Sequence, residues 1–165
     1  MLMTPDRGRK PKPAQSRPTS RVRLRPSSDD PHEIAFFRRH RDDDGQLIPG
    51  RDFLEACPPK VRATMRAVLV TVATSPPKRF VGGGYWEAMK GEMSGWFEVR
   101  VNGPQRHHYR LFCRLDYEAI GREKPLLVVI TGLDKPFRTV LSATDYAAVR
   151  ALGDEYLARN PRSLA

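Results

Sequence analysis

The chain has 165 residues and a formal net charge of +10 at pH 7, with 39% hydrophobic and 29% charged residues. This length fits one domain, and no apolar run approaches the roughly 20 residues of a membrane-spanning helix, which argues against an integral membrane protein. The excess of positive charge favours an anionic partner such as RNA, because each phosphate contact releases a condensed counterion; acidic proteins are the second possibility.

The first 30 residues are predicted to be a disordered basic tail, followed by one domain over residues 31–165. Prolines break any regular element in this segment, and large aliphatic residues are almost absent, so its burial cannot offset the entropy of ordering. It is either a solvated extension or a basic arm that adds affinity for RNA. Cys57 and Cys113 lie far apart without metal-ligand spacing, so we expect a reduced, cytoplasmic protein without metal or cofactor.

The order of predicted elements indicates an α+β fold with an N-terminal strand and a helical pair, a small and mainly antiparallel sheet, and a C-terminal helix. The run at 126–131 is apolar at every position, which is typical of a central strand covered on both faces, and residues 132–136 are expected to leave that strand. The elements are predicted at 33–37 (strand), 51–57 and 59–73 (helices), 96–101, 109–115 and 126–131 (strands), and from Ser142 to before Asn160 (helix).

The two strands around the turn at 102–104 carry arginines on one face. Strand alternation assigns Arg100, Arg110 and Arg114 to this face, while Val99 and Leu111 point the opposite way. Guanidinium groups grip phosphate bidentately and stay charged at any relevant pH, so the face could bind a phosphodiester. The alternative, that Glu98 and its neighbours simply neutralise these arginines across the strands, stays open on spacing alone.

Histidines and aromatic residues accompany the arginines. His107 and His108 begin the return strand, and because neighbours alternate, one of them can point at the arginine face; proton transfer, a surface role and a weak metal site are the options. Trp96 and Phe112 could stack on RNA bases or belong to the core, and Arg114 and Arg138 are expected to contact RNA as well.

These residues resemble the phage-derived, HigB-like branch of the RelE/ParE toxin superfamily. The resemblance covers about residues 33–160 and includes the order of elements. It depends on three short motifs, Glu98-x-Arg100, Tyr109-Arg110-Leu111 and Gly132-x-x-Lys135. A terminal helix follows them.

The resemblance implies the toxin of a type II toxin–antitoxin pair, a metal-independent endoribonuclease that cuts mRNA in the ribosomal A site and is held by a cognate antitoxin, expected to be of the helix-turn-helix type. By position, Arg100 and Arg110 would stabilise the pentacoordinate phosphate, and Lys135 would bind phosphate or assist proton transfer. Catalysis also needs a base for the 2′-hydroxyl and an acid for the leaving oxygen.

One departure from the family pattern concerns proton transfer. The family carries a tyrosine, or a cluster of tyrosine and histidine, shortly after the lysine, whereas residues 136–141 here hold neither. Either His107 or His108 takes the role, or Arg138 compensates, or cleavage has been lost. Two other functions therefore stay open: a non-catalytic nucleic-acid-binding or phage host-takeover protein, and a ParE-like inhibitor of DNA gyrase.

Overall fold

A computed structural model describes residues 25–42, 45–75 and 84–165, so the prediction of a disordered tail lies outside the described residues over 1–24. Ten elements follow one another: β1 (Glu33–Phe36), α1 (Pro49–Ala56), α2 (Pro59–Thr74), β2 (Trp86–Ala88), η1 (Gly91–Met93), β3 (Phe97–Gly103), η2 (Pro104–Arg106), β4 (His107–Asp116), β5 (Leu126–Pro136) and α3 (Ala143–Leu157).

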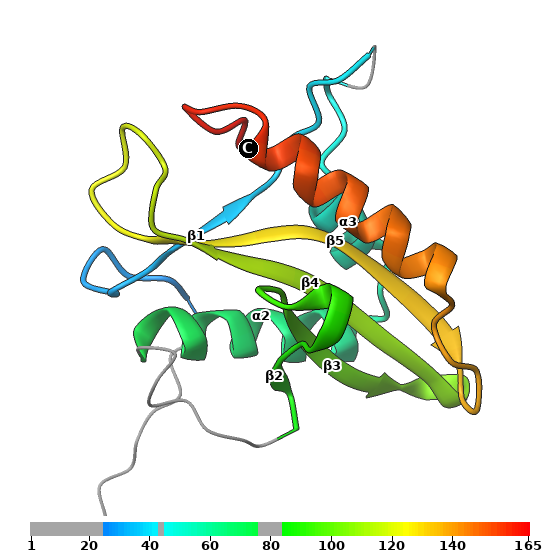
Figure 1. The fold of residues 1–165 in the computed structure, drawn as a ribbon. Coiled ribbons are helices and arrows are strands. Elements are labelled where there is room, and N and C mark those ends of the chain that lie inside the picture. Colours follow the sequence, from blue (N-terminus) through cyan, green and yellow to red (C-terminus); the bar gives the residue numbers. More distant parts are fainter. Residues whose placement is uncertain (1–24, 43–44, 76–83) are drawn as a thin grey trace, which may run out of the picture.

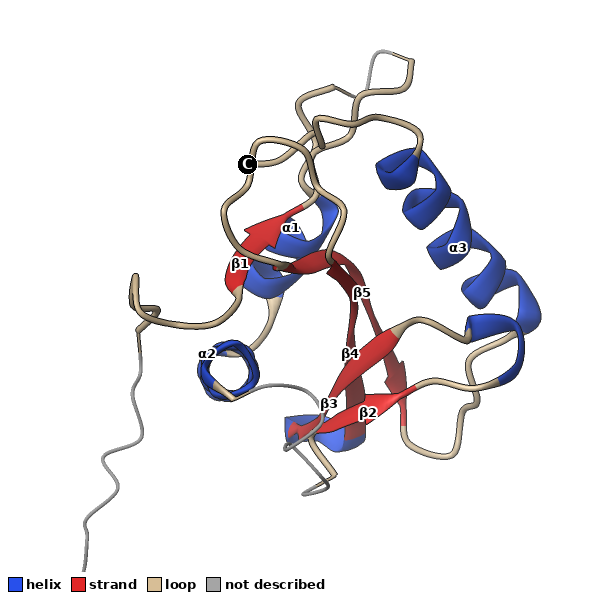
Figure 2. Cartoon of the chain, turned by 60° about the vertical axis from the view of Figure 1, so that its left-hand side comes forward, coloured by secondary structure: helices blue, strands red, loops and turns tan. Residues whose placement is uncertain are grey.

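The strands form one five-stranded sheet in the order β1-β5-β4-β3-β2. β1 pairs with β5 in parallel, and the other three pairs are antiparallel. Helices α1 and α2 cover one face of this sheet, and α3 runs across the other (Figures 1 and 2). The α+β class is therefore confirmed, with helices on both faces of the sheet.

The apolar strand β5, an interior strand between β1 and β4, separates two hydrophobic clusters. Leu127 and Val129 of β5 pack with α1 and α2, whereas Leu126, Val128 and Ile130 pack on the opposite face with α3. All five are fully buried, as strand alternation between two covered faces requires. The prediction that this strand is central is confirmed.

Strand β5 continues to Pro136, so the prediction that the chain leaves the strand after residue 131 is wrong. Pairing with β4 persists to the very end, where His108 lies opposite Lys135 and His107 opposite Pro136. Gly132 lies inside the strand, where it allows close packing. A Cβ atom built there would lie 2.1 Å from the Phe53 ring of α1, so only glycine lets this helix approach the strand.

The short strand β2 has no counterpart among the predicted elements. It is three residues long, too short for alternation to reveal it, and it pairs with β3 at the edge of the sheet. Trp86 anchors it, since its ring is buried and stacks on Phe97 with centroids 5.0 Å apart.

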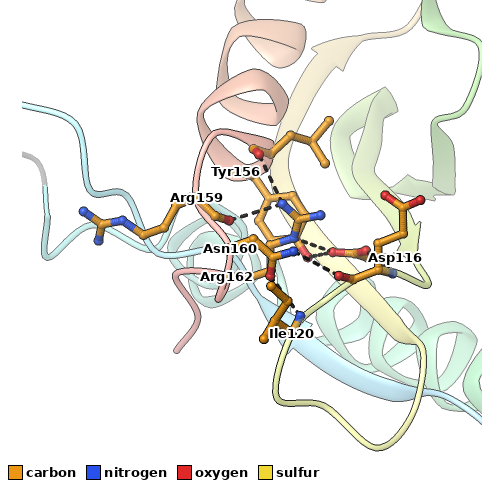
Figure 3. A network of polar contacts seen from close by, with 8 residues as sticks. Asp116, Ile120, Tyr156, Arg159, Asn160 and Arg162 are labelled. Atoms are coloured by element: carbon orange, nitrogen blue, oxygen red, sulfur yellow. Dashed lines mark hydrogen bonds and ion pairs between the residues drawn. The ribbon is translucent and has the colours of Figure 1, made fainter.

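Buried carboxylates, Asp30 and Asp116, attach the two ends of the described chain to the fold. Near the start, Asp30 is buried and its carboxylate accepts a hydrogen bond from the Thr74 hydroxyl at 3.3 Å, so the packed chain begins before residue 31. Near the end, buried Asp116 accepts hydrogen bonds from the Tyr156 hydroxyl at 2.5 Å and from Arg162 Nε at 2.8 Å (Figure 3). The second network fixes the C-terminal segment against the end of β4.

Candidate anion-binding site

The pairing of β3, β4 and β5 assembles the predicted cations on the sheet face that α3 covers. Arg100 lies directly opposite Arg110, and Asn102 lies opposite His108, which in turn lies opposite Lys135. Directly paired residues share a face of a sheet, and so do residues two apart along a strand. Three separate sequence motifs therefore meet at one place on the sheet, beside the start of α3.

A pocket of about 260 Å³ opens among these side chains. Its floor comes from the sheet and its rim from residues 139–141 and the first turn of α3. The titratable groups that line it are Glu98, Arg100, His108, Arg110, Lys135 and Tyr146. The arginines thus converge on an open concavity, as the phosphodiester hypothesis requires.

The guanidinium groups are only loosely paired with Glu98. Its carboxylate lies 3.5 Å from Arg100 Nε and 4.0 Å from Arg110 Nε, both longer than a charge-assisted hydrogen bond. Arg100 makes its short contact with Glu87 of β2 instead, at 2.9 Å. Glutamates on neighbouring strands therefore do neutralise the arginines in part. The Glu98 carboxylate between Arg100 and Arg110, however, is held only by long contacts.

Burial and neighbouring charges shift the pKa values of Glu98, Arg110 and His108 at the pocket. Burial raises the pKa of Glu98, against the opposing effect of the two arginines. Burial and the neighbouring Arg100 lower the pKa of Arg110, and burial with both arginines lowers the pKa of His108. Like charges placed directly across a strand pair repel each other, and an anion bound between the guanidinium groups would relieve that repulsion.

The structure separates the two histidines. His108 lies at the pocket, where its Nδ1 is 2.7 Å from Asn102 Oδ1 and its ring lies 4.4 Å from that of Phe137. His107 is on the opposite face of the sheet, near Tyr109 and with its Nδ1 3.3 Å from Asp134. His107 is therefore not part of the pocket, because adjacent strand residues point to opposite faces.

Lys135 lies at the pocket as expected, but within β5 rather than after it. Its ammonium group is 3.1 Å from the Asp145 carboxylate of α3. Asp145 also completes a capping box at the start of α3, in which Ser142 Oγ accepts from the Asp145 amide at 3.1 Å. The lysine thus ties the rim of the pocket to the start of α3.

Four residues predicted to bind RNA do not line the pocket. Trp96 and Phe112 are 3% and 0% exposed, so neither ring can stack on a base; both pack in the cluster beneath α3, where Gly153 allows the helix to approach Trp96. Arg114 lies over the Trp96 ring, 5.0 Å from its centroid. Arg138 is exposed in the turn after β5, with a φ of 66°.

Two pocket groups were missed as reactive residues by the sequence analysis. Glu98 was considered only as a neutralising partner, although its place two residues before Arg100 assigns it to the same face. Tyr146 comes from α3, far along the chain, and no local pattern connects it with the strands. Burial and Glu98 raise the pKa of Tyr146, so its hydroxyl stays protonated near neutral pH. The pocket therefore contains a tyrosine, although residues 136–141 hold none.

Comparisons with protein-family models, curated proteins and solved structures found no match for this chain. Within residues 25–42, 45–75 and 84–165, no three His, Cys, Asp or Glu side chains gather closely enough to hold a metal ion. Over the same described ranges, no helix is long and apolar enough to cross a membrane.

Proposed function

We propose that this protein is an endoribonuclease that cleaves RNA by means of the RNA's own 2′-hydroxyl. The observation that carries the proposal is the 260 Å³ pocket that combines two guanidinium groups, a carboxyl group with a raised pKa and an imidazole. Together they provide an anion-binding pair, a base and an acid, the three functions that phosphodiester transfer needs.

The reaction assigns one proton transfer to each titratable group. Glu98, when ionised, takes the proton of the 2′-hydroxyl as this oxygen attacks phosphorus. The bond from phosphorus to the 5′-oxygen breaks, and protonated His108 donates a proton to that leaving oxygen. Asn102 Oδ1 accepts from His108 Nδ1, so Nε2 is the nitrogen that exchanges the proton. The products are a 2′,3′-cyclic phosphate and a 5′-hydroxyl end.

The remaining groups stabilise the dianionic pentacoordinate phosphate. Arg100 and Arg110 face it from neighbouring strands, and Lys135 adds a third positive charge from β5. Tyr146, held protonated by its raised pKa, donates a hydrogen bond to a phosphate oxygen. On this assignment a tyrosine of α3 helps to hold the phosphate, whereas proton transfer is left to Glu98 and His108.

The biological setting that we propose follows from the RelE- and HigB-like motifs and the order of elements. On this view the fold is RelE-like, the protein is the toxin of a type II toxin–antitoxin pair, the substrate is mRNA on the ribosome, and a cognate antitoxin restrains it in the cytoplasm. A short neighbouring reading frame that encodes a helix-turn-helix protein would support this setting.

One observation favours a second candidate, a nucleic-acid-binding protein that does not cleave. Arg100 contacts Glu87 at 2.9 Å and Lys135 contacts Asp145 at 3.1 Å, so much of the positive charge at the pocket is already paired. Such a protein would hold RNA at the same pocket without producing new RNA ends.

Primer extension on translated mRNA after induction of the protein separates the two candidates. The wild type is expected to produce cuts at codon positions and to arrest growth, and Arg110→Ala to abolish both. Arg66→Ala removes an equal charge from an exposed position on α2 and serves as the matched control, with cuts retained. Growth arrest without cuts would favour the binding protein, and cuts that persist in Arg110→Ala would refute the assigned site.

A further inference from the structure

We infer that a second pocket, next to the guanidinium pair, holds the base of a nucleotide whose phosphate binds between Arg100 and Arg110, with the Tyr85 ring as its stacking platform. The inference rests on the proposed function and extends it from a single phosphate to a stretch of single-stranded RNA.

The second pocket measures about 530 Å³ and shares a wall with the first. Arg100, His108 and Arg110 line both pockets. A phosphate held by these shared cations therefore borders both cavities at once. A nucleotide on one side of that phosphate then enters the second pocket, which Thr64, Gly84, Tyr85 and Asn102 also line.

Charge distinguishes this pocket from the other cavity that adjoins the catalytic groups. The alternative cavity, of about 680 Å³, has three glutamates against Lys90 and Arg150, which leaves one excess negative charge. The second pocket has Arg100 and Arg110 against Glu87 alone, which leaves one excess positive charge with His108 neutral. Polyanionic RNA is attracted to the pocket with the positive charge, so we expect the RNA to extend past Tyr85.

Tyr85 combines exposure with a fixed position. The residue is 49% exposed, while its carbonyl oxygen accepts a hydrogen bond from the Arg100 amide at 2.8 Å. The ring is thus offered to solvent one strand away from the phosphate-binding arginine. Every base has a π-face, so stacking on such a ring adds affinity for single strands with little dependence on sequence.

The inference is tested by the fluorescence anisotropy of two labelled probes bound to the full chain. One probe is a short 2′-O-methyl oligonucleotide, whose blocked oxygen prevents cleavage. The other is an abasic oligonucleotide of equal length, which has the same phosphates and no bases. Tyr85→Ala is expected to weaken binding of the first probe about ten-fold, which corresponds to about 1.4 kcal/mol, and to leave binding of the second unchanged. Tyr85→Trp should retain affinity for both.

Two further variants make the outcomes decisive. Tyr117→Ala removes a tyrosine that is 64% exposed at the far end of β4, and it should bind both probes as the wild type does. Arg110→Ala should weaken both probes. Suppose that Arg110→Ala weakens the binding of both probes. If Tyr85→Ala then weakens the binding of neither probe, or of both probes equally, the base pocket is refuted and the phosphate site stands. If Arg110→Ala affects neither probe, or the wild type binds neither, the proposed function fails as well.

Discussion

Two clusters of carboxylate and guanidinium differ sharply in how tightly they are paired: one ends β4 at Asp116, and the other lies along the middle of the β3–β4 pair, at Glu98, Arg100 and Arg110. At Asp116, hydrogen bonds from Tyr156 and Arg162 measure 2.5 and 2.8 Å, and the Asp116 and Arg162 side chains are each 6% exposed. At Glu98, the guanidinium contacts are 3.5 and 4.0 Å, and the group lines an open pocket.

The pKa values of the two carboxyl groups move in opposite directions. Burial alone would raise the pKa of Asp116, but the hydrogen bonds from Tyr156 and Arg162 outweigh it and the pKa is lowered. Burial raises the pKa of Glu98, and its loose contacts with the arginines do not reverse this. A saturated carboxylate stays ionised and stabilises the fold, whereas an under-coordinated one is ready to exchange a proton. The comparison therefore indicates a stabilising role for Asp116 and supports the proposed proton transfer by Glu98.

The largest expected effect separates chemistry from stability at Glu98. Glu98→Gln keeps the shape of the side chain but removes the base, so we expect RNA cleavage to fall about 100- to 10,000-fold, with no loss in the free energy of unfolding. Cleavage rates and urea denaturation measure the two quantities. Glu92→Gln, at a side chain that is 85% exposed, is the matched control with full activity. A Glu98→Gln protein with wild-type cleavage would remove Glu98 from the mechanism.

The reverse behaviour is expected at Asp116. Asp116→Ala leaves Arg162 buried without its partner, which should lower the free energy of unfolding by about 3–5 kcal/mol. Cleavage below the midpoint of thermal unfolding should be close to that of the wild type, because the network lies at the end of β4 remote from His108. Asp154→Ala, at an exposed position on α3, should change neither property. A stable Asp116→Ala protein without activity would invert the comparison.

Acidification should separate the two clusters along the pH scale. The pKa of Glu98 is raised above 4.5, so its ionised form, and with it cleavage, is lost first as the pH falls. The pKa of Asp116 is lowered below 3.8, so the stability that it contributes is present above 3.8 and is lost only as the pH drops through the lowered value. As the pH rises, cleavage should begin to decline before pH 6.5 is reached, because the pKa of His108 is lowered and its imidazole loses the proton early.

A profile of cleavage rate against pH, with circular dichroism recorded at each point, checks this order. The expected curve is bell-shaped with a mildly acidic maximum, and its acid limb lies where the protein is still folded. Coincident loss of activity and of ellipticity would show that the acid limb reports unfolding rather than Glu98.

The smallest expected effect concerns the rim of the pocket. Ser142→Ala removes the hydroxyl that accepts from the Asp145 amide at 3.1 Å, and a lost N-cap costs about 1 kcal/mol. Because Asp145 also holds Lys135 at 3.1 Å, the affinity for RNA should change along with the stability. Thr144→Ala, exposed in the same turn, is the control. An unchanged melting temperature would mean that the cap does not contribute to the stability of α3.

Alternation along the strands allowed the core of the site to be predicted from the sequence. It assigned Arg100 and Arg110 to one face, and the register confirms them as a direct pair. It also required that the two histidines diverge, and the structure selects His108. These features are local, since each depends only on the period of a single strand and the turn between two neighbours.

The parts that could not be predicted depend on packing between distant segments. The helix α3 buries Trp96 and Phe112, which exposed strands could otherwise have offered to bases, and brings Tyr146 to the pocket. Residues 132–136 were expected to leave the strand, but Gly132 stays within it and gives the Phe53 ring of α1 room to approach. A contact of this kind leaves no periodic trace in the sequence.

The most direct test of the central claim is the chemistry of the RNA ends. After induction, sequencing of RNA 3′ ends that is selective for 2′,3′-cyclic phosphates should detect new ends in the wild type, none in Glu98→Gln, and wild-type ends in Glu92→Gln. Cuts that carry 3′-hydroxyl ends, or cyclic-phosphate ends that persist unchanged in Glu98→Gln, would contradict the assignment of this pocket as the site of cleavage.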